Sequence, residues 1–398
     1  MTTQATAQRS RLLAAVLLTT ALVAVYAWTA EWDDSAVNVD AEAAAMPAWA
    51  LARHGTIDLS QIETANPWVA PGPRGLLSNR PPGTYLIAVP AYLLFGGDDF
   101  STDPATWTAI WVTAAAMGVL YYALTRVVEG RVALVAAVSL ALGTATWPIA
   151  STQLWPHGPG QLAAALAVLG LVRQRYVLTA PSLGAAILIR PPTAVFAAGV
   201  GIGELLQKRE GRLQRFVLIG TVSALATLGL AIYNQRVYGR FGLSGGYSTS
   251  FEERLVSMQW SDYARNLLDM FVLPPNGLLL WTPLIAVGIL AAARTWRSTP
   301  LWTRAAALSA LLYLLVHARM NRASGGLPFN YRYPLEPLVL ATPLLSVAID
   351  RWRQSSERRQ LLVFAAVAAG FVLQALYTFT LVCEPFDADN VICELGRF

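Results

Sequence analysis

Apolar segments recur along most of the chain, separated by short polar turns or by longer polar loops such as residues 31–104. A bilayer core about 30 Å thick needs roughly 20 apolar residues in each spanning helix, and one soluble core does not need so many such segments. The pattern predicts an all-α integral membrane protein with about eleven transmembrane helices. We place these spans near residues 12–30, 105–125, 132–150, 159–172, 176–190, 192–206, 214–234, 277–293, 303–318, 334–349 and 360–382.

One further apolar segment, residues 82–97, is not predicted to cross. It is short, contains Pro90 in its middle, and leads into Asp98, Asp99 and Asp103 without an intervening basic residue. If it crossed, this acidic loop would lie inside and every later loop would be inverted. An interfacial or re-entrant helix is therefore the better interpretation.

Loop charge predicts the orientation. With the N-terminus inside, the short cytoplasmic segments hold 17 basic and five acidic residues, which leaves 12 of the 29 basic and 19 of the 24 acidic residues outside. This asymmetry follows the positive-inside rule and predicts an N-in, C-out topology. Residues 12–30 follow Arg9 and Arg11 and are longer than a usual signal-peptide core, so we predict an uncleaved first span.

Composition agrees with a multi-pass cell-membrane protein. The 398 residues are 55% hydrophobic and 13% charged, whereas a soluble domain has about 25% charged residues. The net charge of +5 comes from arginines scattered between apolar segments, without a basic run interleaved with aromatic residues. We therefore predict no nucleic-acid partner.

The predicted organisation is one polytopic domain, residues 1–382, followed by an extracytoplasmic tail, residues 383–398. Cys383 and Cys393 both fall in this tail, where an oxidising compartment permits a disulfide; two free thiols are the alternative.

The first outer loop, residues 31–104, contains the most informative chemistry. Asp40 and Glu42 follow the first span, and Asn79 and Arg80 precede the apolar segment near the bilayer surface. A carboxylate can deprotonate an acceptor hydroxyl, while the planar guanidinium of arginine can hold the phosphate of a lipid-linked donor. The alternative interpretation is a solvated acidic loop with an interfacial anchor.

Several sequence blocks resemble the GT-C superfamily, the polytopic glycosyltransferases that use polyprenyl-phosphate sugars. The similarity includes protein O-mannosyltransferases, aminoarabinose transferases of lipid A, arabinosyltransferases and, above all, bacterial GT-C-like membrane proteins of poorly assigned function. The blocks are Asp40, Arg80-Pro81-Pro82-Gly83-Thr84-Tyr85, Leu94-Phe95-Gly96, Leu154-Trp155-Pro156-His157, Leu188-Ile189-Arg190-Pro191-Pro192-Thr193, Tyr233-Asn234, Tyr238-Gly239-Arg240-Phe241, Gly246-Tyr247, residues 274–283 and Asn330-Tyr331-Arg332-Tyr333-Pro334.

The resemblance implies specific roles. Asp40 is the expected general base and Glu42 the alternate, because Ala41 separates two acids that are often adjacent in the family. The expected donor-phosphate ligands are Arg80, Arg332 and Arg190. The expected substrate contacts are Asn79, His157, Arg240, Tyr247 and Tyr331. A structural histidine at His157 and interfacial anchoring by the later loop residues are the alternatives.

The predicted function is transfer of a sugar from a polyprenyl-phosphate donor to an envelope glycan, lipid or protein on the outer face, with inversion. No cofactor is required by the sequence, although the acidic loop permits a divalent metal. The alternative is a non-catalytic transporter or a lipid-carrier-binding subunit of an envelope assembly. Inverted repeats or charges paired in mid-span would favour a transporter, and neither is evident.

Overall fold

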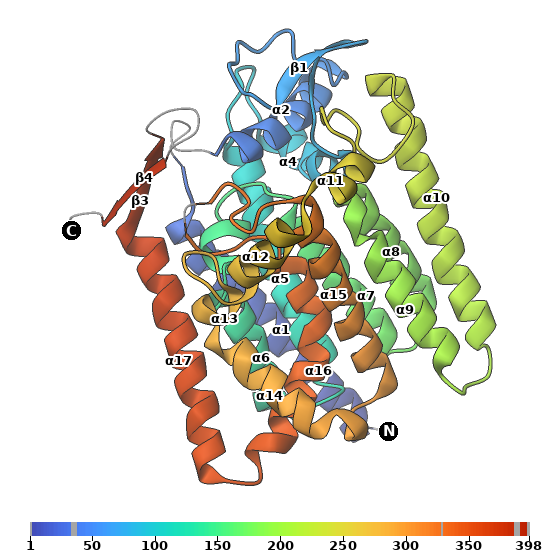
Figure 1. Ribbon diagram of the computed structural model, residues 1–398, viewed down its shortest axis with the longest axis vertical. Helices are drawn as coiled ribbons and strands as arrows, with labels where there is room; N and C mark the ends of the chain where they lie inside the picture. Colours follow the sequence, from blue (N-terminus) through green and yellow to red (C-terminus); the bar gives the residue numbers. More distant parts are fainter. Residues whose placement is uncertain (1, 33–37, 328, 386–390, 396–398) are drawn as a thin grey trace.

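The computed structural model describes residues 2–32, 38–327, 329–385 and 391–395. Long helices form one bundle, and short helices gather at one end of it, away from the N-terminus (Figure 1). Each of the eleven predicted segments overlaps one of the bundle helices. These are α1 (Thr2–Thr29), α5 (Asp103–Leu124), α6 (Gly130–Leu142), α7 (His157–Val172), α8 (Tyr176–Ile189), α9 (Ala194–Leu206), α10 (Arg212–Tyr238), α14 (Pro283–Thr295), α15 (Leu301–Met320), α16 (Leu335–Arg353) and α17 (Glu357–Thr380).

Within these described ranges, five helices are long and apolar enough to cross a membrane by length and composition: α1, α5, α10, α15 and α17. Helices α6, α7, α8 and α9 are apolar but shorter. The structure thus confirms a helical polytopic protein, while the number of spans and their orientation stay predictions.

The end that carries the short elements is called the loop end here. It holds α2 (Val39–His54), the hairpin β1 (Val69–Gly72) and β2 (Gly75–Ser78), α3 (Pro82–Leu86), α4 (Val89–Phe95), α11 (Phe251–Ser257) and α12 (Trp260–Phe271) (Figure 1). Helix α13 (Leu278–Trp281) lies lower, against α17, where the chain enters α14 (Figure 1). Single irregular turns occupy Thr146–Ala150, Pro191–Thr193 and Trp296–Ser298. A second hairpin, β3 (Leu381–Pro385) and β4 (Val391–Leu395), follows α17.

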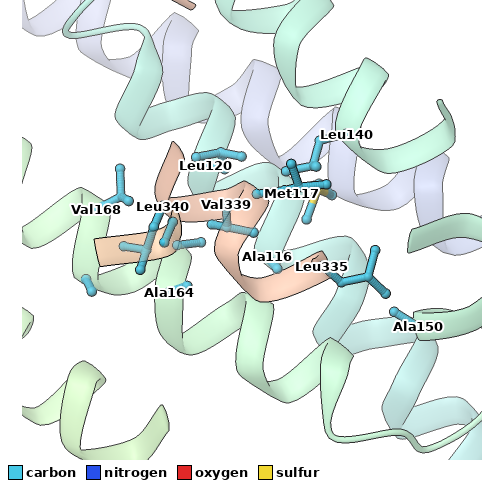
Figure 2. Packing of buried hydrophobic residues seen from close by; sticks show 14 of the residues in the cluster. Ala116, Met117, Leu120, Leu140, Ala150, Ala164, Val168, Leu335, Val339 and Leu340 are labelled. Atoms are coloured by element: carbon cyan, nitrogen blue, oxygen red, sulfur yellow. The ribbon is translucent and has the colours of Figure 1, made fainter. Parts of the chain in front are cut away.

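Small residues allow the bundle core to pack closely. Ala116 of α5 and Ala164 of α7 are fully or almost fully buried, and Met117 and Val339 fill the space beside them (Figure 2). Small side chains let helix backbones approach, which is how helices associate when lipid removes the hydrophobic driving force between them. This closely packed core lies below the loop end (Figure 1).

Residues 82–97 form two short helices, α3 and α4, rather than one span. Helix α4 packs on α2, and Leu93, Leu94 and Phe95 remain exposed, as expected of a helix that meets lipid. Their depth in the bilayer stays a prediction. Helices α11 and α12 were not predicted; both lie in the loop between α10 and α14.

Candidate active site

A cavity of about 180 Å³ opens at the loop end, between α2, the segment before α3, the α8–α9 turn and the segment before α16. Segments from across the whole sequence contribute charged or titratable side chains to it. These are Asp40, Arg80, His157, Arg190, Tyr247, Arg254, His317, Arg332 and Tyr333.

Asp40 lies between two arginines. Arg80 Nη2 donates to Asp40 Oδ1, and Arg332 Nη1 donates to Asp40 Oδ2 at 2.6 Å. Trp68 faces the Arg80 guanidinium at 5.1 Å and Trp155 faces that of Arg332 at 4.6 Å. These rings keep water from the two ion pairs and hold each guanidinium plane, so both arginines are fixed toward one point.

Local structure places Asp40 there. Asn38 caps α2 by accepting from the Asp40 amide at 2.9 Å, which sets Asp40 in the first turn of the helix. Asp40 is 7% exposed. Burial alone would raise the pKa of Asp40, but the charges of Arg332 and Arg80 and their hydrogen bonds outweigh it, so the pKa lies below its usual value. Asp40 is therefore ionised at neutral pH.

Hydrogen bonds fix the segments that carry the two arginines. The Tyr238 hydroxyl donates to the carbonyl of Ser78 at 2.7 Å, just before Arg80. Asn276 donates to the carbonyl of Asn330 at 2.7 Å, two residues before Arg332. Tyr238 and Asn276 belong to two of the sequence blocks described above. They do not contact Asp40, but they hold the backbone segments that carry Arg80 and Arg332.

Arg190 enters the same cavity because α8 cannot continue. Pro191 follows it, and a residue before proline is driven to extended backbone, here φ −150° and ψ 99°. The α8 end also packs tightly on the first loop: a Cβ at Gly83 would lie 2.6 Å from the Ile189 nitrogen. Only glycine permits this approach, which explains the glycine after Pro81-Pro82.

Arg190 belongs to a buried second cluster with Glu336. Arg190 Nη1 donates to both Glu336 oxygens at 3.0 and 3.3 Å, and His157 Nδ1 lies 3.0 Å from Glu336 Oε1. Arg190 Nη2 also donates to His317 Nε2 at 3.3 Å. A buried cation and anion that satisfy one another carry no net charge, so this cluster shapes the cavity without making it more positive.

The predicted catalytic and binding residues fall into three groups: those that line this cavity, those that line a second cavity beside it, and Glu42 and Tyr331, which line neither. Asp40, Arg80, His157, Arg190, Arg332 and Tyr247 line one cavity. Glu42 does not line it, because Glu42 Oε2 accepts from Asn66 Nδ2 at 2.7 Å beside the helix. Tyr331 is 1% exposed, and its hydroxyl pairs with Thr282 in the interior, so it is placed away from the cavity that it was expected to line.

A second cavity of about 330 Å³ adjoins the first and holds the other predicted contacts. Asn79 and Arg240 line it, and Trp68, Tyr247 and Arg254 line both cavities. Asn79 Oδ1 is buried there and has no hydrogen-bond partner in the described part of the chain. Such an acceptor costs free energy unless a ligand supplies a donor.

Glu336 and His317 were not predicted from the sequence as site residues. Glu336 is fully buried and His317 is 3% exposed. A carboxylate at the start of an apolar segment was the available signal for Glu336. His317 has no comparable local signal.

Two predicted features stay untested. Among residues 2–32, 38–327, 329–385 and 391–395, no group of three or more His, Cys, Asp or Glu side chains is arranged to hold a metal ion. Cys383 lies opposite Cys393 in the register of β3 and β4, but their side chains lie outside the described parts, so the disulfide stays a prediction.

Solved structures identify the fold. The chain is similar to the oligosaccharyltransferase AglB of Archaeoglobus fulgidus in complex with an inhibitory peptide and a dolichol-phosphate, with a TM-score of 0.57 and 12% identity over 93% of this chain and 56% of that one. It is also similar to ArnT of Cupriavidus metallidurans bound to undecaprenyl phosphate, with a TM-score of 0.51 and 18% identity over 89% and 63%. This chain has the GT-C fold.

The likeness concerns the fold, since identity is low. The chain spans little more than half of the AglB chain and 63% of the ArnT chain. It matches no protein-family model and no curated protein sequence. The site geometry therefore carries the functional argument.

Proposed function

We propose that this GT-C protein transfers a sugar from a polyprenyl-phosphate donor to an envelope acceptor on the outer face of the membrane, with inversion. The observation that carries this proposal is one buried carboxylate, Asp40, beside two fixed arginines in a cavity at the loop end. A general base and a phosphate ligand are the two groups that such a transfer requires.

The reaction is a single displacement. The acceptor hydroxyl oxygen forms a bond to the anomeric carbon as the bond from that carbon to the phosphate oxygen breaks. The electron pair of the broken bond leaves on the phosphate, where Arg80 and Arg332 stabilise the added charge, and Asp40 takes the hydroxyl proton. Attack on the side opposite the phosphate inverts the anomeric centre.

An apolar groove supports a lipid-linked donor. It measures about 360 Å³ and is lined by apolar side chains, mainly of α14, α15 and α16. Leu314 and Leu338 line it. Leu314 lies within one helical turn of His317, which lines the cavity at Asp40, and Leu338 lies within one turn of Glu336, which pairs with Arg190. A polyprenyl tail in this groove would bring its phosphate to the site from the side. The similar AglB and ArnT structures hold a dolichol-phosphate and an undecaprenyl phosphate, respectively.

The second cavity is proposed to bind the acceptor. It adjoins the Asp40 cavity through Trp68 and Tyr247, and Asn79 offers it an unpaired carbonyl oxygen. An acceptor hydroxyl or amide that donates to Asn79 would lie next to the first cavity and its base.

Asn79→Ala is expected to raise the KM for acceptor about tenfold, the loss of roughly one hydrogen bond, and to leave the KM for donor within about twofold. Thermal unfolding should show no loss of stability, because the removed oxygen has no partner in the protein. Gln61→Ala, an exposed amide of the same loop, is the matched control. Equal rises in the KM for donor and the KM for acceptor would contradict the assignment of Asn79 to the acceptor site.

The function is tested by label transfer. The purified chain in nanodiscs is incubated with a panel of radiolabelled polyprenyl-monophosphate sugars and with envelope extract as acceptor. Transfer from one donor, with inverted configuration in the product, is expected. Binding of polyprenyl phosphate without transfer from any donor would instead support a lipid-carrier-binding subunit, for which the paired arginines would also suffice.

A further inference from the structure

The arginines beside Asp40 have more donors than a carboxylate can use. Asp40 Oδ1 accepts one hydrogen bond from Arg80, and Asp40 Oδ2 accepts one from Arg332. The Nε atoms of both arginines are buried and have no partner in the described chain. A phosphate group has more acceptor oxygens than a carboxylate and can use these remaining N–H groups.

The cavity also carries more positive charge than Asp40 neutralises. Asp40 balances one of its two arginines, and Glu336 balances Arg190. Arg254 lines the same cavity, where its hydrogen bond to Asn321 at 3.4 Å adds no negative charge. Two positive charges therefore remain, which suits a phosphate ester and its more highly charged product.

We infer that the Asp40 carboxylate occupies the phosphate site itself, and that a phosphate group and this carboxylate exclude one another between Arg80 and Arg332. This inference rests on the proposed function, whose donor carries the phosphate. A lipid phosphate that enters the site takes both arginines and releases Asp40 into the cavity.

The exclusion orders the reaction. While both arginines hold Asp40, its oxygens are engaged and their charges keep its pKa low, so it is a poor proton acceptor. Once phosphate neutralises the arginines, the released carboxylate faces a site with less positive charge and becomes a better base. The base is thus made available only when donor is bound.

The test is affinity for a phosphate probe. Binding of fluorescent polyprenyl phosphate, without any sugar, is measured by titration of the purified full chain in nanodiscs. Asp40→Asn is expected to bind about tenfold more tightly than wild type, because the probe no longer competes with a carboxylate for charged hydrogen bonds. Arg80→Gln is expected to bind at least tenfold more weakly.

The controls separate this effect from a change in net charge. Asp98→Asn removes an exposed acid from the same loop and should leave affinity within about twofold. Asp40→Glu keeps the carboxylate and should not tighten binding. Unchanged or weaker binding by a folded Asp40→Asn variant overturns the inference.

A measurement on wild type covers the case in which Asp40→Asn does not fold. Carbodiimide with an amine couples to accessible, protonatable carboxyl groups, and mass spectrometry locates the product. Saturating polyprenyl phosphate is expected to raise labelling of Asp40 several-fold, and unchanged or lower labelling overturns the inference. Labelling that rises in a protein that transfers no sugar would keep the inference and reject the proposed function.

Discussion

Asp40→Asn is expected to lower the rate of sugar transfer about 10²- to 10⁴-fold, the usual contribution of a positioned general base. The amide keeps the size of the side chain but cannot accept the acceptor's proton. Transfer is measured under saturating donor and acceptor, with the amount of protein in the membrane set equal to wild type. The fall should be in kcat, because Asp40 acts in the transition state.

Glu42→Gln is the matched control for this prediction. Glu42 lies on the same helix but points to Asn66, so its transfer rate should stay within about twofold of wild type. The sequence left Asp40 and Glu42 as alternatives, and the geometry favours Asp40. A rate that falls in Glu42→Gln and survives in Asp40→Asn would reverse this assignment.

The two effects of Asp40→Asn run in opposite directions. Transfer should fall while affinity for polyprenyl phosphate rises, since Asp40 is proposed to act as base and also to compete for the phosphate site. A variant that merely unfolds would lose both. If Asp40 only positioned neighbouring groups, the Asp40→Asn variant would not gain affinity for polyprenyl phosphate.

The bundle could be predicted because long apolar segments are the strongest signal that a sequence carries. The short helices of the loop end were harder. Helix α12 mixes Trp260 and Leu268 with Asp262 and Asn266, so no continuous apolar run marks it. Helix α12 is amphipathic, and one of its faces packs on the end of α15, which is distant in sequence. The sequence of α12 alone does not show this partner.

Part of the candidate site could be predicted from the sequence. Asp40 and Arg80 came from one loop, but Arg332 is 292 residues from Asp40, and no local pattern shows that the two meet. Arg190 was found because it is a charge at the end of an apolar segment. Tyr331 was expected beside Arg332, but adjacent residues in an irregular segment point in different directions: Arg332 reaches the cavity, whereas Tyr331 enters the core.

Glu336→Gln is expected to destabilise the protein by about 3–5 kcal/mol, the usual cost of removing one partner from a buried ion pair. Glu336 is fully buried and accepts from Arg190 at 3.0 Å. Its loss leaves a buried guanidinium without a counter-ion, which costs more than the lost hydrogen bonds. Unfolding in mixed micelles, followed by circular dichroism, measures the change.

Asp350→Asn provides the comparison within α16. Asp350 pairs with Arg353 at 2.7 Å, but both side chains are partly exposed, so its loss should cost at most about 1 kcal/mol. A double variant, Arg190→Gln with Glu336→Gln, should be more stable than Glu336→Gln alone, because the uncompensated charge is gone. Glu336→Gln that keeps wild-type stability but loses transfer would instead place Glu336 in contact with substrate, and the buried cluster would then belong to the catalytic machinery rather than to its support.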